Sequence, residues 1–300
     1  MEQARFSGRR FLLITVLNVT ITIFELLGGI VSGSLALISD ALHNLSDSFS
    51  VILSYIAHRI GMRSPTPKNT YGYQRAEIIA ALLNSLILVF LSVYLLIEAI
   101  KRIMQPEQVS GGVMFWTALI SFAANLFATI LLSRDSKHNL NLRATYLHLL
   151  SDALASVGVI IGSLLIFFFK ISWVDPVVTI LVSLYIAYEA WPIIRQTLMI
   201  LMEGSPAIDP TEVKNTIMTI PSVRGVHHFH TWLINENELV ASVHVNLANQ
   251  SLRETELIYS QIEELLQKKY KIMHVTIQAE CTRGLKDKMC FSKDDEKQQH

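Results

Sequence analysis

Residues 34–50, SLALISDALHNLSDSFS, decide how this chain folds. The stretch is apolar enough to lie inside a membrane, yet it carries Asp40, His43 and Asp47. His43 and Asp47 are four residues apart, so a helix presents their side chains on one face. Ionisable groups are costly inside a bilayer and are rarely kept there without a function. The pattern therefore indicates a functional site within a membrane helix.

A second apolar stretch, residues 146–162 (YLHLLSDALASVGVIIG), repeats the spacing with His148 and Asp152. Two packed helices that each offer an imidazole and a carboxylate can supply the four ligands of a tetrahedral metal site. The two carboxylates would neutralise a divalent ion, and imidazole favours zinc, although cobalt, nickel and copper remain compatible. The alternative is four separate polar contacts between helices, which leaves each group as an isolated cost.

Asp40 has two interpretations. It lies three residues before His43, on roughly the same helix face, so it is a candidate for an outer partner that orients the imidazole. It is equally compatible with a polar contact between helices.

Composition agrees with a membrane protein. Of 300 residues, 51% are hydrophobic and 17% are charged, against about 25% charged in a soluble domain. The mean hydropathy is +0.39. Apolar runs dominate up to about residue 202, and the rest resembles an ordinary soluble domain. The formal net charge of zero argues against nucleic acid as a partner.

Six apolar segments are each long enough to cross a bilayer of about 30 Å: approximately 11–31, 35–58, 76–100, 113–133, 145–169 and 175–201. Lysine and arginine collect before the first segment and in the loops after the second and fourth. This asymmetry predicts that both termini are cytoplasmic. We expect a multi-pass protein with a transport domain at 1–203.

The polar region predicts a small cytoplasmic α/β domain at 204–283, with the element order αββαβ, followed by a disordered charged tail at 284–300. Asp209 is the expected cap of its first helix, and residues 251–270 form an amphipathic helix. Strands are expected at 225–233, 238–247 and 274–280. Cys281 and Cys290 are interpreted as reduced thiols.

Metal and protons compete for the same ligands, because a ligand must be deprotonated to bind. Imidazole titrates near physiological pH. A site open to one side of the membrane could release metal as it takes up protons, which predicts proton-coupled antiport.

These residues resemble the cation diffusion facilitator family, in particular its zinc-preferring bacterial exporters. The resemblance covers nearly the whole chain and lies in SLALISDALHNLSD, YGYQRAE, YLHLLSD, VDP and GVHHFHTW. It implies a Y-shaped homodimer in the bacterial plasma membrane. It also implies alternating access and export of divalent metal from the cytoplasm in exchange for protons. The transport site would be His43, Asp47, His148 and Asp152.

The resemblance also implies a ferredoxin-like C-terminal domain that binds further zinc ions. His227 and His244 match family ligand positions, Glu280 stands where a carboxylate is common, and His230 and His274 are possible helpers. Strict strand alternation predicts that the intervening His228 faces away from His227 and His230.

Two departures from the family are visible. The loop KNTYGYQRAE has Asn69 and Tyr73 at positions where some relatives place zinc ligands, so we expect no site there. The loop between the fourth and fifth segments is short and has only His138, which favours a bacterial protein over eukaryotic relatives with a long histidine-rich loop.

Other functions fit the sequence less well. An intramembrane zinc hydrolase would need an open coordination position and typically an H-E-x-x-H motif, which this chain lacks, so we expect no enzyme. A membrane-anchored metal sensor would not need two intramembrane ligand pairs. A manganese or iron exporter would be expected to replace His43 or His148 with Asn or Asp.

Overall fold

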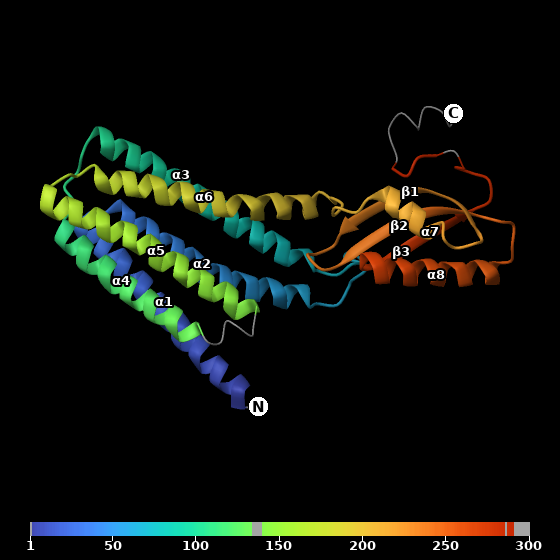
Figure 1. Ribbon diagram of the computed structural model, residues 1–300, viewed down its shortest axis with the longest axis horizontal. Helices are drawn as coiled ribbons and strands as arrows, with labels where there is room; N and C mark the ends of the chain where they lie inside the picture. Colours follow the sequence, from blue (N-terminus) through green and yellow to red (C-terminus); the bar gives the residue numbers. More distant parts are fainter. Residues whose placement is uncertain (1, 134–139, 286, 291–300) are drawn as a thin grey trace. The chain divides into compact units, whose positions relative to one another are not determined.

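Helix α2, Leu35–Gly61, carries Asp40, His43 and Asp47. In the computed structural model, the backbone of residues 2–133, 140–285 and 287–290 is described, with the side chains of 16–131, 133, 146–147, 149–285 and 287–290 (Figure 1). The described part of the chain has five more long helices, one before α2 and four after it: α1 Glu2–Ser32, α3 Arg75–Met104, α4 Gly111–Leu132, α5 Leu140–Phe169 and α6 Val174–Leu201.

Within the residues that the structure describes, four segments are long and apolar enough to cross a membrane: Arg75–Met104, Gly111–Leu131, Leu149–Phe169 and Val174–Leu201. Val16–Ser32 is apolar but shorter. Large side chains on these helices, such as Phe90 and Tyr188, point away from the protein interior. Apolar side chains exposed on such helices are suited to lipid.

Small residues let neighbouring helices approach closely. Gly28 of α1 lies directly against Thr117 of α4, and a Cβ there would overlap the threonine side chain. Gly111 opens α4 beside α5, where a Cβ would lie 2.7 Å from the backbone nitrogen of Phe167. Glycine at such contacts is typical of packed membrane helices.

The chain divides into two compact units. The first comprises Met1–Tyr55 and Ala81–Ile194, and it contains most of the helical region. The second comprises Ile56–Ala80 and Arg195–His300. Within the second unit, the side-chain amide of Asn235 donates a hydrogen bond to Gln74, so the loop before α3 is tied to the turn between the first two strands.

The C-terminal domain has the element order predicted from the sequence: α7 Pro210–Ile217, β1 Val223–Leu233, β2 Leu239–Leu247, α8 Leu252–Tyr270 and β3 Ile272–Glu280. Asp209 caps α7 by accepting from the backbone N–H of Thr211. Ser251 and Glu254 form a capping box at the start of α8. These caps satisfy backbone donors that a helix start leaves unpaired.

The sheet has the order β1-β2-β3, with β1 antiparallel to β2 and β2 parallel to β3 (Figure 1). Helix α8 forms the crossover that a parallel pair requires. Both helices contribute to one apolar core with the strands. Among its members, Ile262 and Leu266 of α8 and Val243 of β2 are fully buried.

Candidate metal centres

Helix α2 brings His43 and Asp47 together. His43 Nε2 lies 3.6 Å from Asp47 Oδ2, as the four-residue spacing predicts. Their side chains are 13% and 27% exposed, so the pair is half-buried within the helical unit. An imidazole beside a carboxylate on one helix face can offer a divalent ion two ligands.

Helix α5 supplies Asp152, whose residue is 4% exposed. Asp152 interacts electrostatically with Asp40 of α2. The side chain of His148 lies outside the described residues, although its backbone continues α5. The structure therefore describes three of the four predicted transport ligands in full.

Asp40 belongs to a buried group of carboxyl residues from three helices. It is 5% exposed, and it interacts electrostatically with Glu25 of α1 as well as with Asp152. Glu25 is fully buried and accepts a hydrogen bond of 3.1 Å from the side chain of Asn44 on α2. These contacts connect α1, α2 and α5 through polar groups, in keeping with the interhelical interpretation of Asp40.

A buried carboxylate fixes the start of α2. Asp175, in the first turn of α6, is 0% exposed. It accepts hydrogen bonds from the Ser34 hydroxyl, from Leu35 N–H at 2.8 Å and from Ala36 N–H at 3.3 Å. It therefore caps α2 from another helix, at a terminus that favours negative charge. His43 and Asp47 follow on the same helix, so this cap helps to position them.

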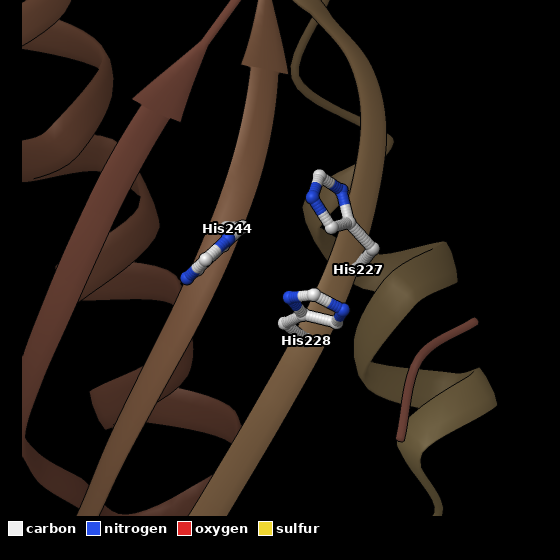
Figure 2. Close-up of side chains that lie close together, drawn as sticks. All are labelled: His227, His228 and His244. Carbon is white, nitrogen blue, oxygen red and sulfur yellow. The ribbon is translucent and has the colours of Figure 1, made fainter. Parts of the chain in front are cut away.

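Three histidines meet on the sheet of the C-terminal domain. Figure 2 shows His227 and His228 on β1 and His244 on β2, with their rings turned toward one another. Ring centroids lie 5.0 to 5.3 Å apart, and one nitrogen from each ring lies within 4.8 Å of the other two. The three nitrogens would have to move closer together to share a zinc ion with bonds of about 2.0–2.1 Å.

The orientation of His228 corrects the sequence prediction. His228 has a φ of 47°, and the β1–β2 register shifts between His227 and His230. The extra residue of this bulge breaks the alternation, so His228 stays on the side of His227. Phe229 then returns to the apolar core. Nothing in the local sequence requires a bulge here, so the rule of strict alternation assigned His228 to the wrong side of the sheet.

Glu280, near the end of β3, contacts two of these rings. Its Oε2 lies 3.2 Å from His227 Nε2, and its Oε1 lies 3.3 Å from His244 Nδ1. Gln278 also donates a hydrogen bond of 2.7 Å to Oε1. A carboxylate beside three imidazoles completes a donor set suited to zinc.

Burial and the neighbouring imidazoles lower the pKa of His244, against the opposing effect of Glu280. A lowered pKa keeps the ring neutral, which is the form that binds metal. His227 is 1% exposed, and within the described part of the chain neither ring nitrogen makes a hydrogen bond of good geometry. A buried polar group without such a bond is costly, and a bound cation would relieve that cost.

The other two predicted helpers lie outside this cluster. His230 is exposed and pairs with Ser242 across the sheet. His274 is exposed on β3, opposite Val240. Cys281 and Cys290 are free and exposed, in agreement with the predicted thiols.

Comparison with known proteins shows which family the chain belongs to. The family described as the cation efflux transmembrane domain matches residues 11–202, and the one described as the cation efflux protein cytoplasmic domain matches residues 206–281. The chain belongs to the cation efflux family. Members of this family are transporters rather than enzymes, so the helical unit is a membrane domain and the sheet belongs to its cytoplasmic domain.

Bacterial members of the cation efflux family are similar over most of their length. A cadmium, cobalt and zinc/H(+)-K(+) antiporter of Bacillus velezensis is 38% identical over 279 residues, which cover 91% of this chain and 89% of the relative. The zinc transporter ZitB of Escherichia coli is 36% identical over 277 residues, covering 91% and 88%. ZitB of Pectobacterium atrosepticum is 34% identical over 288 residues, covering 95% and 89%.

Proposed function

We propose that this protein exports divalent metal from the cytoplasm in exchange for protons, with Zn2+ as its main cargo and Cd2+ or Co2+ as further cargo. The proposal rests chiefly on the His43–Asp47 pair, which lies on a helix of the membrane domain, and on the buried carboxyl of Asp152 on α5. The names of the relatives, which refer to zinc, cadmium and cobalt transport, support this choice of cargo.

In this proposal His43, Asp47, His148 and Asp152 form a tetrahedral site, and alternating access presents it to either side of the membrane. Protons displace the ion because the same nitrogen and oxygen atoms bind both. Six membrane spans, 1–203, place both termini in the cytoplasm of a bacterial cell. The domain at 204–283 has a ferredoxin-like fold and dimerises with a second copy.

A second part of the proposal concerns the cytoplasmic domain. There, His227, His228 and His244 hold a structural zinc with Glu280. The donor set supports this assignment, since three imidazoles and one carboxylate favour zinc over the harder cations. Such an ion would tie β1, β2 and β3 together.

Metal uptake into proteoliposomes under an imposed pH gradient tests the transport proposal. His43→Ala and Asp152→Asn should reduce zinc transport to the level of empty vesicles, while the purified proteins keep their elution profile and unfolding temperature. Glu98→Gln, which changes a half-buried carboxylate on α3 that pairs with Lys101, is the matched control and should transport normally. Full export by the His43→Ala protein would end the assignment, and uptake indifferent to the pH gradient would remove proton coupling.

A further inference from the structure

The chain continues past β3 and folds back over the histidine cluster. We call residues 281–285 and 287–290 the strap. Phe229 N–H donates to the carbonyl of Met289 at 2.7 Å, and His228 N–H donates to the carbonyl of Lys288 at 3.3 Å. The strap therefore bonds to β1 at the bulge that turns His228 toward the cluster. Met289 also packs against the apolar core.

The strap lies directly on His227. Gly284 has a φ of +68°, and a Cβ at this position would overlap the His227 ring. Only glycine allows both this conformation and this approach without strain. The preceding carbonyl, of Arg283, accepts a hydrogen bond of 2.6 Å from the side chain of Asn246 on β2. The backbone of the strap thus covers the buried ring.

The strap also carries a second carboxylate to the cluster. Asp287 Oδ2 lies 3.6 Å from His228 Nε2, and Asp287 N–H closes a turn by donating to the Gly284 carbonyl at 3.0 Å. A separation of 3.6 Å is an ion-pair distance but too long for a hydrogen bond. Histidines that bind metal almost always hold a carboxylate, carbonyl or water with the other ring nitrogen.

We propose that the strap is locked by a divalent cation: the ion bound by His227, His228 and His244 holds the strap closed through the contact between His228 and Asp287. The inference rests on the zinc site proposed for the cytoplasmic domain. Together, Glu280 and Asp287 balance the double charge of the ion, while three neutral imidazoles bind it. Metal level in the cytoplasm then sets whether the strap covers the sheet.

Hydrogen–deuterium exchange of the full-length protein in detergent, with and without added Zn2+, tests this coupling. Cys281→Ser and Cys290→Ser in all samples exclude zinc binding by strap thiols, and Asp47→Asn removes the proposed transport site. Zinc should slow exchange at the amides of His228 and Phe229, because both donate to the strap. Zinc affinity is measured by competition with a chelator.

Asp287→Asn should weaken zinc affinity by about 10-fold or more, as is usual for the loss of a carboxylate that supports a ligand. It should also abolish the zinc-induced protection of these two amides. Glu256→Gln is the charge-matched control, since Glu256 is exposed on α8; it should change neither readout. Gly284→Ala, which forces the strap away from His227 without changing a carboxylate, should also lose the protection.

The outcomes separate this inference from the proposal on which it rests. If zinc binds the wild-type cluster but the amides exchange at the same rate with and without it, the strap proposal is wrong and the zinc site stands. If Asp287→Asn retains wild-type affinity and protection, the proposal is also wrong. If the number of zinc ions bound per chain does not depend on His227 and His244, the cytoplasmic zinc site itself is wrong.

Discussion

Asp175→Ala should destabilise the membrane domain, because Asp175 is the fully buried acceptor for three donors at the start of α2. Loss of a helix N-cap costs about 0.5–2 kcal/mol, and each buried donor left unsatisfied adds about 1–3 kcal/mol. The Ser34 hydroxyl can rotate to another acceptor, so most of the lost stability comes from the two backbone N–H groups. We expect a loss of about 3 kcal/mol in the free energy of unfolding.

Asp175→Asn is the matched variant. Its amide oxygen can still accept from Leu35 or Ala36, so the expected loss is smaller, about 1 kcal/mol. For a domain of this size, a loss of 3 kcal/mol corresponds to a fall of about 6–12 °C in the unfolding midpoint. Thermal unfolding of the purified protein in detergent measures both variants.

Glu98→Ala controls for removal of a carboxylate, because Glu98 is half-buried and pairs with the exposed Lys101, a pair expected to contribute little. The reasoning is refuted if Asp175→Ala unfolds at the wild-type temperature, or if alanine and asparagine cost the same. Fraying of the first turn of α2 should also slow zinc transport, since His43 lies about 12 Å further along that helix.

Three further perturbations test the packing and the caps. Ile262→Ala, at a fully buried position of α8, should cost about 2–5 kcal/mol and should lower the unfolding midpoint of the cytoplasmic domain; an unchanged midpoint would contradict the assigned core. Gly111→Ala should push α4 from Phe167 and reduce the thermal stability of the membrane domain, whereas Gly158→Ala, with open space around it, should not. Glu254 accepts hydrogen bonds from Ser251, and these bonds lower the pKa of Glu254 below 4.5. The contribution of Glu254 to stability is therefore present above about pH 4.5 and is lost as the pH falls through the lowered pKa. Glu254→Ala should destabilise the domain at pH 7 but make little difference near pH 3, which circular dichroism melts can measure.

Features set by neighbours in sequence were predictable. The spacing of His43 and Asp47 determines their shared helix face, and the structure shows the pair in contact. Asp209 and Ser251 are recognisable caps, and they begin α7 and α8 as expected. The order of helices and strands in the C-terminal domain follows from the same local signals.

Features set by distant residues were not predictable. The contacts of Asp175 with the start of α2 could not be predicted, because they join residues 140 and 141 positions apart. At the bulge, the N–H groups of His228 and Phe229 donate hydrogen bonds to the strap, a segment expected to have little order from Gly284 onward. His228 was therefore assigned to the wrong face.

The bulge at His228 also constrains how this gene can change. β1 has one more residue than β2 between the pairs His227–His244 and His230–Ser242. Deleting one codon here would restore a regular ladder, but β1 would then offer a single imidazole beside His244. A deletion that makes the strand more regular would thus remove one of the three proposed imidazole ligands, and insertions or deletions in this strand should be rarer than substitutions.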